Sequence, residues 1–358
     1  MTVSEQIKKL FGTLRPDDKK ALLVELSQPE NPVNKEDDNI SSCPYCNHVE
    51  FVKNGKPKGI QRYKCKSCRH NFIASTGTVF QWIRDKDKFE SYKSIMLNEG
   101  FISLKQMAKR VDISIQTAFD WRHKILSTLK PNEGCFEDIT EMDDVWFLYS
   151  QKGRKGLKYS RKRGGSKRKG DNNFQVKMLI TSDRKNTQDL SVVRIGRLKR
   201  NDIERKVGEK INKGCKLVSD KHASIASFAK KNKIDHVSFK ASEHTADSEH
   251  HVQTVNNIAS RLKTRVNHVY RGVSTKYLQC YANWFQFVEA NKNNDDIQLE
   301  ANKLLAGNKT SWDVFTNIEI LYKQFIKEYS KRTYRCPTKR QWKTQLRDTS
   351  SLSRLAYL

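Results

Sequence analysis

Two aspartates in apolar stretches are the first residues in this sequence whose pattern suits chemistry. Asp143 lies in the stretch that begins at Ile139, and Asp220 directly follows the short apolar run that ends at Ser219. Both stretches have the composition of buried strands. We therefore expect the two carboxylates to emerge at the ligand-facing edge of one α/β sheet.

A predicted helix over 251–269 adds two polar residues, Asn256 and Lys263, which are seven residues apart. That separation is about 700° of helical rotation, so both side chains project from one face about 10 Å apart. Two aspartates and an amide oxygen are hard oxygen ligands that suit two magnesium or manganese ions in phosphodiester displacement. Asp143, Asp220, Asn256 and Lys263 are therefore the candidate catalytic residues, the first three as magnesium ligands and the lysine as a fixed charge for phosphate.

Three other residues near these positions compete for the same roles. Asp144 and Glu249 are carboxylates that could enter the site, and Glu249 lies in the turn before the helix that carries Asn256. His222, two residues after Asp220, is a candidate to touch the scissile phosphate. The plainer interpretation is that these groups cap turns or lie at the surface. The sequence leaves open whether Asn256 or a nearby acid completes the metal site.

Four of the eight cysteines form two C-x2-C pairs, Cys43 with Cys46 and Cys65 with Cys68, separated by 18 residues. Each pair turns tightly enough to aim two thiolates at one ion, and a turn-rich segment lies between two strand-like stretches. The pattern predicts a zinc ribbon with one structural zinc ion. Redox pairs or disulfides are the alternative, which a cytosolic compartment and the lack of a thioredoxin-like pattern disfavour.

The charge balance indicates a polyanionic partner, with nucleic acid as the leading candidate. Lys and Arg total 68 against 40 Asp and Glu, for a net charge of +28 and a pI near 9.7. The segment 151–170 holds ten Lys or Arg and no acid, so it is a candidate phosphate-contacting loop, although a solvated hairpin tip or a localisation tract is the alternative. Its candidate DNA-binding residues are Lys152, Arg154, Lys155, Arg161, Lys162, Arg163, Lys167, Arg168 and Lys169.

A second candidate for DNA binding is a pair of predicted helices. Ser103 caps the first, a break falls at 111–114, and the second runs over 115–126, which is the layout of a helix-turn-helix. Its second helix would then enter the major groove with Gln116, Thr117 and Arg122 exposed. An ordinary helical hairpin is the alternative.

The 358 residues are too many for one ordinary domain, and the pattern predicts a multidomain α/β protein. Three consecutive strands followed by alternating helix and strand predict a mixed sheet. No run of eighteen apolar residues and no signal-peptide core are present, so we expect a cytoplasmic, nucleoid-associated protein with no membrane partner. The expected segments are a helical lead-in and linker over 1–40, the zinc ribbon over 41–74, the helix-turn-helix over 75–132, the mixed-sheet domain over 136–290 and a helical, basic tail over 291–358.

In this order the motifs resemble those of bacterial insertion-sequence transposases of the ISXO2-like, IS1595-type group. That group has an N-terminal zinc ribbon and a DD-N-K catalytic set on a ribonuclease-H-like fold. The resemblance covers roughly residues 41–290 and is carried by Cys43-Pro-Tyr-Cys46, Arg62-Tyr-Lys-Cys-Lys-Ser-Cys68, Ser75-Thr-Gly-Thr-Val-Phe80, Asp143, Ser219-Asp-Lys-His222, His251-Val-Gln-Thr-Val-Asn256, Leu262-Lys263 and Gly272-Val-Ser-Thr-Lys-Tyr-Leu278.

By this resemblance Asp143 and Asp220 are the metal-binding aspartates, Asn256 replaces the glutamate of the commoner DDE triad, and Lys263 is the paired lysine. The resemblance implies cleavage at the inverted-repeat ends of a transposon and strand transfer into double-stranded target DNA. A homodimer or higher oligomer on DNA is expected, because two ends must be paired. A catalytically inactive or domesticated DNA-binding regulator is the alternative, and a nuclease without strand transfer is a third possibility.

Overall fold

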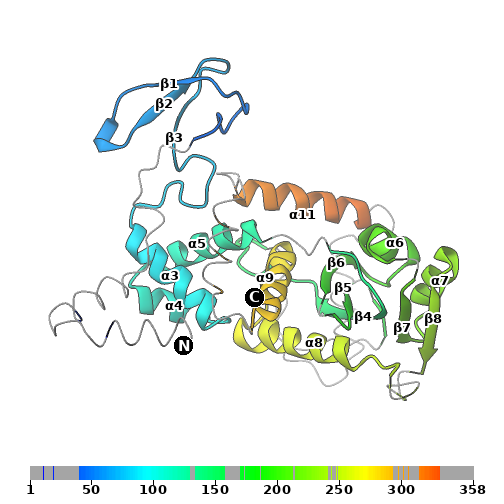
Figure 1. Cartoon of the computed structure of the whole chain (residues 1–358). Helices are drawn as coiled ribbons and strands as arrows, with labels where there is room; N and C mark the ends of the chain where they lie inside the picture. The colour runs from blue at the N-terminus through cyan, green and yellow to red at the C-terminus, as the bar shows by residue number, and fades with distance from the viewer. Residues whose placement is uncertain are drawn as a thin grey trace. The chain divides into compact units, whose positions relative to one another are not determined.

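The computed structural model of this chain divides into two compact units, Met1–Thr76 and Gly77–Leu358 (Figure 1). It describes residues 40–129, 134–157, 170–172, 174–185, 187–212, 214–240, 247, 249–292 and 314–330, with isolated positions at 11, 19, 243, 297, 301 and 305. The helices predicted within 1–40 and the end of the predicted basic tail lie outside these residues. Within the described part, no helix is both long and apolar enough to cross a membrane.

The first unit contains a small antiparallel sheet. Its strands, in the order β1-β2-β3, are β1 (Phe51–Lys53), β2 (Arg62–Cys65) and β3 (Asn71–Ile73). Tyr63 and Phe72 are buried with Cys43 and Cys65, and Phe51 meets both rings edge-on. The first two strands were predicted, whereas β3 was not, because three residues carry too little periodicity to be recognised.

Three helices open the second unit: α3 (Lys86–Asn98), α4 (Leu104–Val111) and α5 (Ile115–Thr128). Ser103 and Ser114 accept hydrogen bonds from the first-turn amides of α4 and α5, as their side-chain chemistry predicts. Asp112 ends α4 in the left-handed region, at a φ of 54°. The two helices are thus joined by a turn of three residues, in agreement with the predicted break.

A five-stranded mixed sheet forms the body of the second unit (Figure 1). In the order β6-β5-β4-β7-β8, its strands are β4 (Ile139–Leu148), β5 (Gln175–Asp183), β6 (Gln188–Ile195), β7 (Lys216–Asp220) and β8 (Asp235–Phe239). β4, β5 and β6 are antiparallel, whereas β4 with β7 and β7 with β8 are parallel. The predicted mixed sheet is therefore confirmed, with β4 at its centre.

Helices cover both faces of this sheet. They are α6 (Arg200–Val207), α7 (Ala223–Asn232), α8 (Gln253–Thr264) and α9 (Leu278–Ala290), and a π-helical turn (Arg265–Val269) extends α8. Val145 and Phe147 on β4 pack into a core with α8 and α9, whereas Met142 belongs to a core with α6 and α7. Side chains of a strand alternate between its faces, so odd-numbered residues of β4 face α8.

Helices α3 to α5 share a third core with the end of the α/β segment. Trp121 and Ile125 of α5 are buried in one cluster with Tyr270, Tyr281 and Trp284. A last helix, α11 (Val314–Ser330), contacts α5 and β6. The predicted helix pair and the mixed sheet therefore belong to one compact unit.

Candidate active site

Asp143 and Asp220 lie level with each other on neighbouring parallel strands. The ladder between β4 and β7 pairs Glu141 with Val218, and two residues further along each strand the same register aligns Asp143 with Asp220. Val145 and Val218 both pack into the α8 core. Because side chains alternate along a strand, both carboxylates project toward the α8 side of the sheet.

The two carboxylates are held in an environment that disfavours their ionised forms. Burial raises the pKa of Asp143 to about 7, and the negative charges of Asp220 and Asp144 contribute to that shift. Burial also raises the pKa of Asp220, against the opposing effect of His222. The Oδ1 atom of Asp220 is buried and has no hydrogen-bond partner. Two close acids with an unsatisfied buried oxygen fit a site that is completed by a cation.

Asp144 faces the opposite side of the sheet and is already paired. Its Oδ2 lies 2.6 Å from Nζ of Lys177, which lies equally close to Asp171. Its Oδ1 lies 3.6 Å from Nε2 of His222, and Nδ1 of that histidine accepts a hydrogen bond from the amide of Ser224 at the start of α7. Asp144 and His222 thus both have partners on this face of the sheet.

Glu141 is a residue of the site that the sequence interpretation missed. Its side chain is 1% exposed, and both of its carboxylate oxygens accept hydrogen bonds from the start of α8. Oε2 accepts from the amides of Thr254 and Val255 at 2.9 and 3.2 Å, and Oε1 accepts from the Thr254 hydroxyl at 2.8 Å. Oε1 also lies 2.6 Å from Nη1 of Arg184 and 3.4 Å from Nδ1 of His251.

These contacts make Glu141 a positioning residue for α8. A carboxylate at a helix N-terminus satisfies amides that lack partners within the helix and interacts favourably with the helix dipole. Glu141 lies two residues before Asp143 on the same face of β4, so the strand that carries one aspartate also fixes the helix that carries Asn256. An acid within an otherwise apolar strand was the signal that could have identified it.

The flank of α8 that carries Asn256 and Lys263 lies beside the apolar face of the helix. Val255, Ile258 and Leu262 are buried against the sheet, and Asn256 and Lys263 follow at about 90° around the helix. Nζ of Lys263 lies 5.7 Å from the ring centroid of Trp146, three residues beyond Asp143 on β4. In the described residues neither Asn256 nor Lys263 hydrogen-bonds to either aspartate.

No third acid joins the aspartates in the described part of the chain. Glu249 is exposed, and its amide donates to Oδ1 of Asp247 at 2.8 Å while its carbonyl accepts from Arg184. Among the described residues, the one group of three or more His, Cys, Asp or Glu side chains close enough to hold an ion is the cysteine set. The structure therefore does not place Glu249 beside Asp143 and Asp220 as a third metal ligand.

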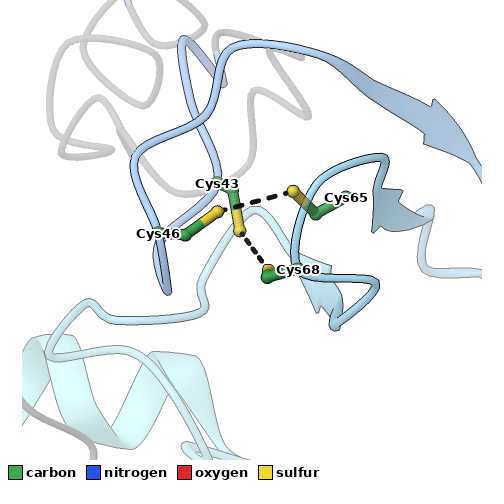
Figure 2. A group of neighbouring side chains, drawn as sticks. All are labelled: Cys43, Cys46, Cys65 and Cys68. Carbon is green, nitrogen blue, oxygen red and sulfur yellow. Dashed lines mark hydrogen bonds between the residues drawn. The ribbon is translucent and has the colours of Figure 1, made fainter.

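The four paired cysteines converge in the first unit, as Figure 2 shows. Their Sγ atoms all lie within 4.8 Å of one another. Cys43 is 3.6 Å from Cys68, and Cys46 is 3.6 Å from Cys65. Sulfur atoms that share a tetrahedral zinc ion with bonds of about 2.3 Å lie about 3.8 Å apart. The cluster therefore has the size and donor set of a metal site.

The helix residues proposed to contact DNA divide into exposed and buried groups. Gln116 is exposed at the start of α5, where its Nε2 donates to Asp120. Thr117 is half-buried, and its hydroxyl lies 2.8 Å from that of Ser114. Both remain on the outer side of the first turn of α5.

Arg122 was predicted to be exposed, and this prediction is wrong. Its side chain is 0% exposed, and Nη2 donates to the carbonyl of Ile102 at 2.8 Å. The guanidinium lies 5.7 and 5.6 Å from the ring centroids of Tyr270 and Trp284. An arginine is enclosed in this way because its stem and planar head pack against aromatic faces, so it joins α5 to the shared core.

The basic loop is described only at its beginning. Nζ of Lys152 donates to the carbonyls of Tyr270 and Gly272 at 2.7 and 2.6 Å, so this lysine closes the end of the π-helical turn. Arg154 and Lys155 are exposed. The other predicted DNA-binding residues, Arg161, Lys162, Arg163, Lys167, Arg168 and Lys169, lie outside the described residues.

The α/β segment is similar to a known protein family. Residues 136–289 match the family model of the ISXO2-like transposase domain. An uncharacterized protein in transposable element ISH50 of Halobacterium salinarum is 31% identical over 129 residues, which are 35% of this chain and 43% of that protein. The matched segment thus spans less than half of that relative.

Solved structures with some likeness include two Mos1 complexes. The pre-cleavage Mos1 transpososome is 9% identical over 87% of this chain and 94% of that chain, with a TM-score of 0.24. The Mos1 strand transfer complex is 10% identical over 63% of this chain and 79% of that chain, with a TM-score of 0.20. Scores this low do not establish a shared fold. The segment that matches the ISXO2-like transposase domain, residues 136–289, contains both aspartates, Asn256 and Lys263.

Proposed function

We propose that this protein is a DNA transposase of an insertion sequence, which cleaves phosphodiester bonds at the ends of its element and transfers the cut strand into target DNA. The observation that carries the proposal is the pair of half-buried carboxylates, Asp143 and Asp220, level on adjacent strands of a segment that matches a transposase domain. The sheet order, with three antiparallel strands followed by two parallel ones, supports a ribonuclease-H-like fold.

A divalent metal site suits these residues. Asp143 and Asp220 would supply two negative charges, and the amide oxygen of Asn256 would add a neutral ligand. Magnesium or manganese, when bound, activates the attacking oxygen and stabilises the leaving oxygen. Lys263 supplies positive charge beside a phosphate from the same flank of α8 as Asn256.

The chain's other residues prepare the site rather than react. Glu141 fixes the first turn of α8, the helix that carries Asn256, at strand β4. Lys177 pairs with Asp144 on the opposite face of the sheet, which leaves Asp143 and Asp220 as the carboxylates available to a metal ion. Water attacks first at the element's end, and the freed 3′-hydroxyl then attacks target DNA without a covalent protein intermediate.

The N-terminal part of the chain is proposed to recognise DNA. Four cysteine thiolates would hold one structural zinc ion and so order the small sheet of residues 41–74. The helix-turn-helix formed by α4 and α5 would place Gln116 and Thr117 in the major groove. Because two transposon ends must be paired, the active form is proposed to be a dimer or higher oligomer on DNA.

Cleavage of DNA that carries the element's own ends tests this function. With magnesium or manganese the wild-type protein should cut at the ends, and Asp143→Asn and Asp220→Asn should each abolish cutting while the melting temperature shows that they fold. Asp171→Asn is the matched control, because Asp171 pairs with Lys177 on the opposite face of the sheet. Cutting at the wild-type rate by either variant would contradict the assignment of the aspartates.

A further inference from the structure

A wide groove in the second unit has no role in the chemistry described above. It has a volume of about 1430 Å³ and is lined by the starts of α4 and α5, the loop 151–157, the segment 270–277 and one side of α11. The exposed residue Gln116 lies at its rim together with Ile115, so the first turn of the candidate DNA-reading helix opens into it.

The groove is strongly basic. Seven Lys or Arg line it, and Glu319 is the one acid among its described lining residues. Nζ of Lys276 lies 2.7 Å from Glu319, and Nζ of Lys323 lies 3.8 Å from it, so this acid is compensated within the groove. Arg154 and Lys155 of the loop and Lys323 and Lys327 of α11 are exposed, which leaves positive charge on two facing walls.

Helix α11 is fixed to the rest of the groove by polar contacts. The hydroxyl of Tyr149, at the end of β4, lies 2.5 Å from that of Tyr322 on α11. The ion pair between Lys276 and Glu319 joins the 270–277 segment to the same helix. These two contacts therefore hold the helix that carries Lys323 and Lys327 against the groove.

We propose that this groove binds the phosphodiester backbone of one continuous DNA segment, the segment whose bases face α5. On this basis α11 forms one side of the DNA-binding groove. The sequence analysis predicted no DNA-binding residue in the tail to which this helix belongs. The inference rests on the proposed function for the identity of the polyanion. A small anion would need one compact cluster of donors, whereas these charges are spread over a loop and a helix on either side of an open groove, which suits a chain of phosphates.

The salt dependence of binding to a mixed-sequence DNA duplex tests the groove. Phosphate contacts do not depend on sequence, and each lost contact makes the negative slope of log K against log salt shallower by about 0.9. The variants Arg154→Gln with Lys155→Gln, and Lys323→Gln with Lys327→Gln, should each make the slope shallower by about 1.8. Lys230→Gln with Lys233→Gln, at the end of α7, removes the same charge outside the groove and should leave the slope unchanged.

The charge-preserving pair Lys323→Arg with Lys327→Arg should retain the wild-type slope, which separates lost charge from a misfolded helix. If the α11 double variant matches the α7 control, the groove does not bind DNA. That result is distinguishable from failure of the proposed function, because metal-dependent end cleavage by the wild-type protein is measured separately at saturating DNA. If the wild-type protein cleaves DNA but the groove variants and the α7 control all have the wild-type slope, the proposed DNA-binding groove is wrong and the proposed function stands.

Discussion

At the scale of single residues, the site is defined by which of its acids have a basic partner and which do not. Asp143 and Asp220 were identified from the sequence because an acid inside or just after an apolar strand is conspicuous. The sequence could not show that Asp144 is neutralised by Lys177 or that both oxygens of Glu141 are occupied, because each of those facts depends on partners 33 or more residues away. Long-range partners therefore decided which acids remain available.

Replacement of Asp143 by Asn should stabilise the metal-free protein at neutral and higher pH. The pKa of Asp143 is raised to about 7 in the folded state, above its unfolded value near 4. The folded state therefore binds this proton more tightly, and stability is lost as pH rises from about 4 to about 7. The loss is up to about 4 kcal/mol, and Asp143→Asn removes it.

Thermal melting in the presence of a chelator measures this effect. The variant should melt several degrees above the wild type at about pH 8 and close to it at about pH 4. Added magnesium should stabilise the wild type and not the variant, because ligand binding to the folded state raises its stability. A melting difference that does not change with pH would contradict the burial argument.

Elements were predictable to the extent that their signals are local. The cap at Ser103, the break at 111–114 and the apolar strands of the mixed sheet follow from neighbouring residues, and the structure contains them. The strand β3 was missed because it is three residues long. Arg122 was predicted to be exposed but is buried, because Tyr270 and Trp284 of a distant segment pack against it.

The attachment of α8 to the sheet depends on Glu141. Glu141→Gln keeps the shape of the side chain but leaves Arg184 and the first-turn amides with a weaker partner, so it should destabilise the protein by about 3 kcal/mol. End cleavage should fall further than the folded fraction does, because Asn256 moves with α8. Unfolding by denaturant and cleavage at a temperature where the variant is folded measure the two effects.

Glu137→Gln is the control for Glu141, because Glu137 is exposed and pairs with Lys185 at 2.6 Å. This surface pair should contribute little to stability. If Glu141→Gln behaved like Glu137→Gln in both measurements, the role of Glu141 in positioning α8 would be wrong.

The whole molecule combines a strong positive charge with a pair of acids on the sheet. The net charge of +28 indicated a polyanionic partner without locating it. The structure places four exposed basic residues on two walls of one groove and the paired aspartates on the sheet beside α8. Charge distribution is a property of the folded chain, so composition could predict the class of partner but not the binding surface.

Metal removal should unfold one unit and leave the other folded. Residues 1–76 and 77–358 form separate compact units, and the first has a small core around its cysteines. The purified protein should contain one zinc ion by elemental analysis, and Cys46→Ser should lose it while Cys135→Ser, at an unpaired cysteine, should retain it. A full complement of zinc in Cys46→Ser would contradict the site.

Strand joining is the most direct test of the central claim that Asp143 and Asp220 support transposition. The protein is incubated with DNA that carries the element's ends, a target plasmid and magnesium, and joined products are measured. The account predicts that wild-type protein and Asp171→Asn join the cut ends to the plasmid and that Asp220→Asn yields neither cut nor joined DNA. End binding by the wild type without any cut or joined product, or joining by Asp220→Asn at the wild-type rate, would contradict it.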